Sequence, residues 1–173
     1  MDHDPSTHPA AWPIDRLLAE CDVRRGRGSG PGGQRRNKVE TAVTLTHRPS
    51  GVTAQASERR SQAENHRAAA FRLRVNLALA VRGEGRESTR GPSPLWSARV
   101  RDGRLAVNPT HDDFPALLAE ALDRLGDRGH DVPAAASDLG VNASQLIKLL
   151  RHEPRALVAV NAARQAEGRT PLR

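Results

Sequence analysis

The chain has 173 residues, a formal net charge of +7 and an aromatic content of only 2%. A core of this composition has to be built from Leu, Val and Ala. The single cysteine, Cys21, excludes an intrachain disulfide framework and a CxxC metal site, and no signal pattern or membrane-length apolar stretch is found. We therefore expect a soluble, cytoplasmic protein with one buried thiol and no membrane partner.

Basic charge is concentrated in the first half of the chain. Residues 21–90 contain 15 Arg or Lys against 6 Asp or Glu, whereas residues 91–173 contain 11 against 10. Lys38 and Lys148 are the only lysines, and arginine forks suit phosphate. The first half is thus predicted to bind a polyanion, with a merely solvated basic surface as the alternative.

Between residues 13 and 57 the pattern predicts a short helix and a hairpin. Pro13 is typical of the first turn of a helix, here over residues 13–20. Alternating apolar residues predict strands at Ala42–His47 and Val52–Ser57, joined by a turn at residues 48–51. We expect His47 to lie on the sheet surface rather than to act in acid–base chemistry.

A long helix is predicted to follow this hairpin. Ser61 and Glu64 have the spacing of a capping box, and Gly83 marks the end. The expected apolar stripe consists of Ala68, Phe71, Val75 and Leu79. The fold class is therefore α+β: a small antiparallel sheet with a packed long helix, followed by an all-α region.

The second half divides into a linker and a helical region. Residues 84–94 are rich in Gly, Pro and Ser, and Asp102-Gly103 predicts a short hairpin between Ser97–Arg101 and Arg104–Val107. Helices are predicted from Asp113, over 133–139, over 142–151 and over 154–167. We therefore expect domains at 1–83 and 111–173, separated by a linker at 84–110.

Within the helical region, Ala136, Gly140, Leu146 and Leu149 have the spacing of a helix-turn-helix core. This would expose one face of the second helix, with Asn142, Ser144, Gln145, Lys148 and Arg151 on it. Three interpretations remain open for residues 111–173: contact with RNA or the ribosome, contact with DNA, or a protein-binding or structural bundle.

The most unusual segment is RGSGPGGQRRNK, from Arg27 to Lys38. A P-loop is excluded because Gln34-Arg35 stands where that motif requires Lys and then Ser or Thr. A flexible linker would explain an isolated Gly-Gly-Gln tripeptide. A loop of backbone N–H donors with a catalytic role is the other interpretation.

The tripeptide is not isolated, because further motif residues follow it in order. They are Asn37-Lys38, Val39-Glu40-Thr41-Ala42-Val43, Thr46-His47-x-Pro49-x-Gly51 and Glu58-x-Arg60-Ser61-Gln62-x-x-Asn65. Over about residues 20–80 the chain resembles the GGQ catalytic domain of class I peptide-chain release factors and their short, codon-independent ribosome-rescue relatives. The resemblance implies peptidyl-tRNA ester hydrolysis, with large-subunit rRNA and peptidyl-tRNA as partners. Separately, we expect the chain to be a monomer.

The resemblance also assigns residue roles. Gly32, Gly33 and Gln34 are the expected catalytic residues: the Gln34 N–H stabilises the oxyanion and its side chain selects water, without a metal or organic cofactor. Methylation of the Gln34 amide is a further expectation. The expected RNA-binding residues are Arg24, Arg25, Arg27, Arg35, Arg36, Lys38 and Arg60, and the expected loop-supporting residues are Ser29, Asn37, Ser61, Gln62 and Asn65. Arg35-Arg36 departs from the family pattern.

The sequence shows neither a stop-codon decoding domain nor a Lys/Arg-rich C-terminal tail. We therefore expect peptide release that does not depend on a stop codon, in the rescue of stalled or damaged ribosomes. The alternative is a non-catalytic RNA- or DNA-binding protein that retains the release-factor scaffold.

Overall fold

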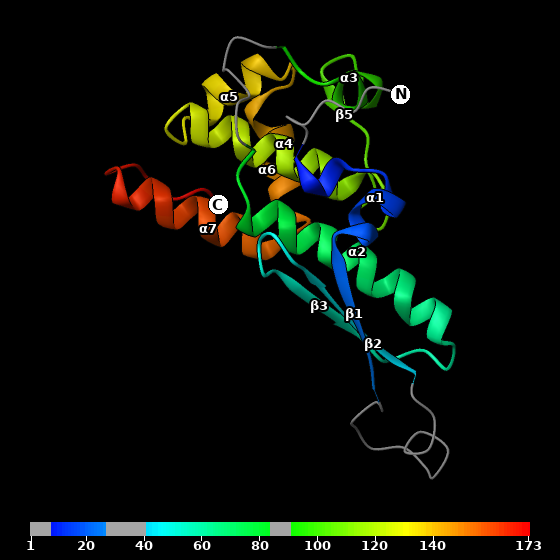
Figure 1. Cartoon of the computed structure of the whole chain (residues 1–173). Helices are drawn as coiled ribbons and strands as arrows, with labels where there is room; N and C mark the ends of the chain where they lie inside the picture. Colours follow the sequence, from blue (N-terminus) through cyan, green and yellow to red (C-terminus); the bar gives the residue numbers. More distant parts are fainter. Residues whose placement is uncertain (1–7, 27–40, 84–90) are drawn as a thin grey trace.

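The computed structural model describes residues 8–26, 41–83 and 91–173. In chain order its elements are η1 (Pro9–Ala11), α1 (Ile14–Ala19), β1 (Cys21–Gly26), β2 (Ala42–His47), β3 (Thr53–Ala56), α2 (Gln62–Ala80), α3 (Pro94–Arg99), β4 (Val100–Arg101), β5 (Arg104–Leu105), α4 (Phe114–Asp127), α5 (Val132–Asp138), α6 (Ala143–Arg151) and α7 (Pro154–Ala166). A three-stranded sheet with α2 across it lies below a group of helices in Figure 1. The expected α+β class is confirmed.

The sheet is antiparallel, in the order β1-β2-β3. The predicted hairpin of β2 and β3 is present, and Val43 pairs with Ala56 in its register. The first strand, β1, was not predicted from the sequence. Apart from Cys21 its residues are exposed or half-buried, so no apolar alternation marks it. Backbone pairing along β2, from Cys21 with His47 to Gly26 with Ala42, holds this edge strand in place.

His47 is buried rather than on the sheet surface, with only 2% of its surface exposed. Its Nδ1 contacts Ser50 Oγ at 2.7 Å, and its ring meets Trp12 edge-on. Burial lowers the pKa of His47, and Nε2 lies 3.6 Å from Glu20 Oε2, beyond hydrogen-bonding distance. The surface expectation was wrong because Trp12 and Glu20, on either side of α1, lie against His47. The thiol of Cys21 is buried, as expected.

Helix α2 is capped as predicted, since the Ser61 side chain accepts from the Glu64 N–H. The predicted apolar stripe is only partly correct, because Val75 alone among its four residues is buried. Ala69, Leu73 and Leu77 are fully buried instead. The helix contacts the sheet on one side and α4 on the other, so buried positions extend around it and no single helical stripe describes them.

Residues 97–99 are helical, not extended as predicted. Ser93 accepts from the Trp96 N–H, and Pro94 occupies the first turn of α3. Trp96 is fully buried and its Nε1 donates to the Leu139 carbonyl at 2.8 Å. The predicted hairpin follows in a shorter form, as β4 and β5, with both Asp102 (φ 49°) and Gly103 (φ 69°) left-handed.

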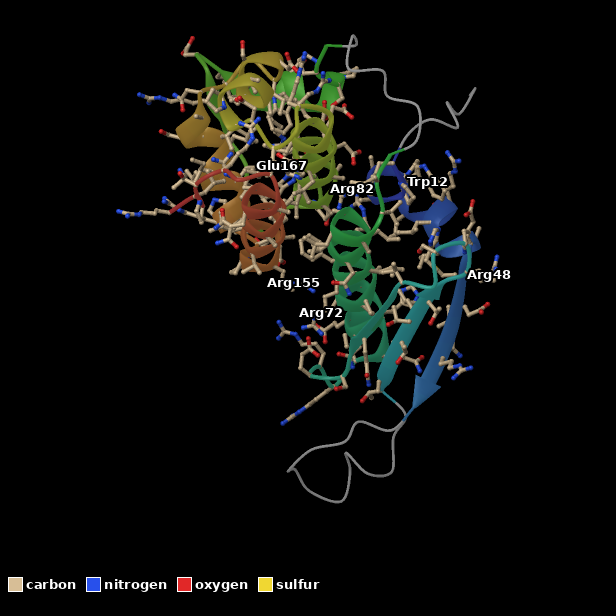
Figure 2. All side chains as sticks on the ribbon, turned by 90° about the vertical axis from the view of Figure 1, so that its left-hand side faces the viewer. Trp12, Arg48, Arg72, Arg82, Arg155 and Glu167 are labelled. Carbon is tan, nitrogen blue, oxygen red and sulfur yellow. The ribbon has the colours of Figure 1, made fainter. Side chains whose placement is uncertain are left out.

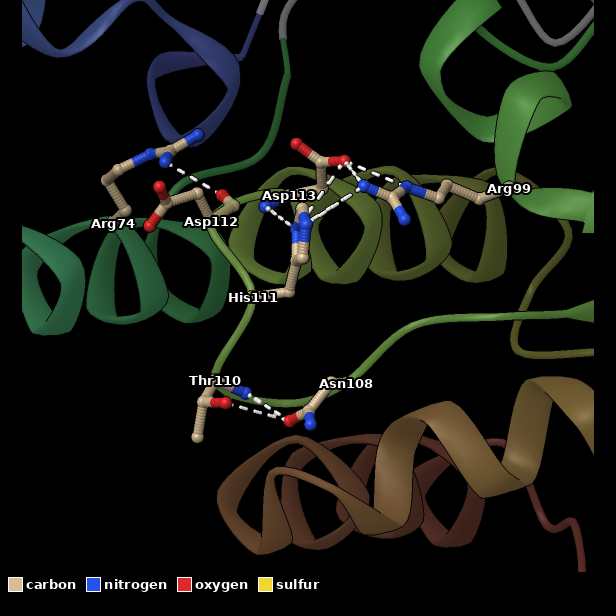
Figure 3. Close-up of polar contacts among 7 residues, drawn as sticks. All are labelled: Arg74, Arg99, Asn108, Thr110, His111, Asp112 and Asp113. Atoms are coloured by element: carbon tan, nitrogen blue, oxygen red, sulfur yellow. Dashed lines mark hydrogen bonds and ion pairs between the residues drawn. The ribbon is translucent and has the colours of Figure 1, made fainter.

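The four predicted helices of the C-terminal half are present as α4 to α7. Asp113 precedes α4, but its carboxylate accepts from Arg99 Nε at 2.9 Å instead of capping the helix. Arg74 of α2 donates to the main-chain oxygen of Asp112 at 2.8 Å. Helices α2 and α3 therefore both contact the residues just before α4 (Figure 3). Gly140, with φ 65°, makes the turn between α5 and α6.

One contiguous hydrophobic core joins the sheet to the helices, from Leu45 through Leu73 and Leu117 to Leu146. At the start of α7, Arg155, which is labelled in Figure 2, donates from Nη1 to Asn76 Oδ1 of α2 at 2.9 Å. The division at residues 83 and 110 remains a prediction. Within the described residues, no helix has both the length and the hydropathy to cross a membrane.

Candidate functional site

The candidate site lies at the end of the sheet where β1 stops and β2 begins. The strands are antiparallel, and their last pair is Gly26 with Ala42. Residues 27–40, which join them, lie outside the described residues; this segment includes the predicted site residues Arg27, Ser29, Gly32, Gly33, Gln34, Arg35, Arg36, Asn37 and Lys38. We call residues 27–40 the GGQ segment. The structure describes what surrounds it, namely the ends of β1 and β2, the loop before α2 and the start of α2, and these surroundings are called the frame below.

Asn65 is the most constrained polar side chain of this frame and is completely buried. Its Nδ2 donates to the Thr41 carbonyl at 2.7 Å and to the Arg59 carbonyl at 2.9 Å. Its Oδ1 accepts from the Arg59 N–H at 2.9 Å. One amide therefore joins the residue that follows the GGQ segment to the loop that precedes α2.

That loop is further tied to α2 by a charged pair. Glu58 accepts from the Ser57 N–H at 2.8 Å and forms an ion pair with Arg72, whose Nη1 also donates to the Gln55 carbonyl at 2.8 Å. Together these donors, Arg72 first, lower the pKa of Glu58 to about 2. The loop between β3 and α2 is thus attached at both of its ends.

Exposed arginines surround the frame. Arg24 pairs across the strands with Thr44, and Arg25 with buried Val43, so these two arginines lie on opposite faces of the sheet. Arg60 is exposed in the loop before α2. Arg59 is also exposed there and was not predicted, although its place beside Arg60 is the signal that would have suggested it. In the described ranges none of these four side chains forms an ion pair, so all are accessible to a polyanion.

The other predicted supporting residues lie at the start of α2. Ser61 Oγ accepts from the Glu64 N–H at 3.4 Å, which makes Ser61 the N-cap, and Gln62 is the first helical residue. Residues 8–26, 41–83 and 91–173 contain no group of three or more His, Cys, Asp or Glu placed to hold a metal ion. The described residues at this end of the sheet thus combine a buried amide, the capped start of α2 and exposed arginines.

Comparison with known proteins shows which protein family has a domain similar to this part of the chain. The profile of the RF-1 domain family matches residues 14–95, which include the whole sheet and α2. Over this range the chain is similar to the class I peptide chain release factors, and the match covers a little under half of its residues. No solved structure matches the chain.

Several curated relatives have this family's name. Peptide chain release factor 1 of Acidiphilium cryptum is 34% identical over 126 residues, covering 68% of this chain and 36% of the relative. Peptide chain release factor 2 of Wolinella succinogenes is 33% identical over 127 residues, covering 65% and 34%. The chloroplastic factor PrfB1 of Arabidopsis thaliana is 47% identical over 60 residues, covering 35% and 13%. The chain thus spans about a third or less of the length of these relatives.

Proposed function

We propose that the chain hydrolyses the ester bond of peptidyl-tRNA on the ribosome and so releases the nascent peptide. The observation that carries this proposal is the sequence Gly32-Gly33-Gln34 between two paired strands of an RF-1 domain. The names of the relatives support release activity for the family. The proposed partners are the large-subunit rRNA and the peptidyl-tRNA.

The chemistry follows from the residue types. When water attacks the ester carbonyl, negative charge develops on its oxygen, and a preorganised backbone N–H stabilises that charge. We assign this donor to Gln34. Gly32 and Gly33 have no side chains to prevent close approach, and the Gln34 amide can hydrogen-bond water without acting as a strong base. Positioning by RNA supplies much of the remaining rate enhancement.

The described frame supports this assignment in two ways. Asn65 attaches Thr41, which follows the segment, to the base of α2. The exposed arginines Arg24, Arg25, Arg59 and Arg60 provide charge for RNA phosphates on either side of the sheet end. By sequence alone, Arg27, Arg35, Arg36 and Lys38 would add to that charge, and Ser29 and Asn37 would support the loop.

We also propose that this chain releases peptide without reading a stop codon and acts on stalled or damaged ribosomes. The proposal rests on its domain content, an RF-1 domain joined to helices α4 to α7. A non-catalytic RNA- or DNA-binding protein on the same scaffold is the second candidate. The buried helix-turn-helix spacing of α5 and α6 favours this second candidate.

The deciding experiment is peptide release from ribosomes halted on an mRNA without a stop codon. Gln34→Pro removes the backbone N–H and should slow release by about 100-fold or more, as loss of one oxyanion donor does. Gln34→Ala, which keeps that N–H, is the matched control and should retain much more activity. Gly33→Ala should also be severely impaired while ribosome binding persists.

Two outcomes would contradict the proposal. Release at the wild-type rate by Gln34→Pro would remove the catalytic assignment and favour the binding protein. Release that requires a stop codon in the decoding site would overturn codon independence but leave the hydrolytic chemistry in place.

A further inference from the structure

Helices α5 and α6 form a packed unit that presents one face of α6 to solvent. Ala136, Leu146 and Leu149 are buried at 1% exposure or less, and Asn142 caps α6 by accepting from the Gln145 N–H at 2.9 Å. Both helices also contact α4. The outward positions of α6 and the residue after it are Ser144, Gln145, Lys148, Arg151 and His152, and none of them is acidic.

The β4–β5 hairpin lies beside this face. Leu105 and Val107 line a shallow hollow together with Gln145, Lys148, Leu149 and His152 of the α6 side. The hairpin and the residue Val107 after it therefore lie against the α6 side. The sequence had placed this hairpin in a linker.

The hairpin adds two cations in an unfavourable arrangement. Arg101 and Arg104 are direct partners across the strands, and both are exposed. Directly opposite like charges destabilise a strand pair. In the described ranges neither arginine, nor Lys148, forms an ion pair with a carboxylate. An anionic ligand would relieve this repulsion.

Residues 91–173 have a small net charge, but their acidic and basic side chains are not evenly distributed. Several of its carboxylates pair with arginines: Asp113 with Arg99, Asp138 with Arg128 and Asp131 with Arg169 outside α6, and Glu153 with Arg155 just beyond the C-terminal end of α6. Asp102, at the tip of the hairpin, is the acidic residue next to the exposed cations. Arg151 donates to the main-chain oxygen of Arg173. The face is therefore basic although the region is almost neutral.

We propose that the α6–hairpin face, made of Arg101, Arg104, Ser144, Gln145, Lys148 and Arg151, binds the backbone of an RNA double helix. The choice of RNA rests on the proposed function at the ribosome. Side chains do not enter the deep major groove of A-form RNA, so contact falls on phosphates and 2′-hydroxyls. Arg101, Arg104 and Lys148 suit the phosphates, and Ser144 and Gln145 suit the hydroxyls. Binding should depend on salt and little on base sequence.

The test measures binding of the full chain to a fluorescent RNA duplex by anisotropy over a range of salt concentrations. The duplex has about 20 base pairs, a length that exceeds the span of known duplex-binding modules. Arg104→Ala and Lys148→Ala should each weaken binding and reduce the magnitude of the salt slope by about one, and the double variant by about two. Arg67→Ala removes an exposed arginine from α2 and is the matched control, with binding and slope unchanged. Arg104→Ala should not lower the unfolding temperature, because it relieves the repulsion from Arg101.

Three results would overturn the inference: wild-type affinity of the double variant, an equal loss in Arg67→Ala, or tighter face-dependent binding of a DNA duplex of the same sequence. The assay contains no ribosome and no peptide release. Gln34→Pro should bind the duplex as the wild type does, so failure of this inference and failure of the proposed hydrolysis are distinguishable.

Discussion

At the residue scale, Asn65 supports the candidate site with all of its hydrogen-bonding groups used. Both amide hydrogens and the amide oxygen are engaged, and the side chain is completely buried. Removal of the amide takes the partner from three part-buried backbone groups, which costs about 1–3 kcal/mol for each such group that stays dry. The sequence motif Glu58-x-Arg60-Ser61-Gln62-x-x-Asn65 predicts that Asn65 supports the loop. The hydrogen bond from Asn65 to the Thr41 carbonyl is the contact through which it would do so.

We predict that Asn65→Ala lowers the free energy of unfolding by about 2–4 kcal/mol, because three backbone groups lose their partner. Asn65→Asp should be no better, since a carboxylate would face two carbonyl oxygens. Urea unfolding followed by circular dichroism measures both effects.

The matched control is Asn76→Ala on the same helix. Asn76 is half-buried; its Nδ2 donates to the Thr53 carbonyl at 2.8 Å and its Oδ1 accepts from Arg155 Nη1 at 2.9 Å. Water can replace part of both exposed contacts, so we expect a loss of less than about 1 kcal/mol. Equal losses at both positions would contradict the special role of Asn65.

At the element scale, the loop between β3 and α2 is positioned by interactions at both ends. Asn65 holds Arg59, and Arg72 holds Glu58 and the Gln55 carbonyl. The depressed pKa of Glu58 links this attachment to pH. Above its unfolded value, near 4.5, Glu58 is charged in both states and the ion pair contributes its full stabilisation. As pH falls toward about 2, protonation of the folded state removes that contribution.

We therefore predict that Glu58→Gln is less stable than the wild type at neutral pH and that the difference disappears between pH 4.5 and about 2. The Glu58 and Arg72 side chains are 46% and 48% exposed, so the effect at neutral pH should stay below about 1 kcal/mol. Thermal unfolding of both proteins at a series of pH values measures it. A difference that persists at pH 2 would show that the contact is not electrostatic.

At the scale of the whole molecule, α2 connects the candidate site to the helical half. Its 19 residues span about 28 Å, from the Asn65 contact with Thr41 to the region of α4. There Asp123 of α4 accepts from the Gly83 N–H at 3.2 Å and pairs with Arg82. A Cβ at Gly83 would lie 2.7 Å from Asp123 Oδ2, so glycine suits this contact. Helix α4 therefore covers a face of α2 that would otherwise be exposed.

We predict that removal of residues 111–173 strongly destabilises the sheet and α2, because it exposes apolar surface on α2. The shortened chain should lose cooperative thermal unfolding or unfold at a much lower temperature, and it should bind a hydrophobic dye. Removal of 154–173, which deletes only α7, should have a smaller effect. If residues 1–110 unfold cooperatively at the temperature of the full chain, the two halves are independent.

Local elements were predictable to the extent that their signals lie within a few residues. The capped start of α2 at Ser61, the turn at Gly51 and the helices from α4 to α7 follow from nearby caps, glycines and apolar spacing. The strand β1 could not be predicted, because its stability comes from pairing with β2 and its own residues are mostly exposed. The prediction of a single apolar stripe on α2 failed for a related reason, since the sheet and α4 bury residues on different sides of this helix.

The sequence by itself determined the β2–β3 hairpin, the helices α2 and α4 to α7, and the hypothesis of a GGQ segment, because the order and spacing of those residues are visible in one dimension. Only the tertiary structure decided that His47 is buried, that the hairpin lies beside α6, and that Asn65 joins Thr41 to Arg59. These features depend on contacts between residues far apart in the chain, such as Asn65 and Thr41, which are separated by 24 in sequence. Packing brings such residues together, and no local propensity encodes it.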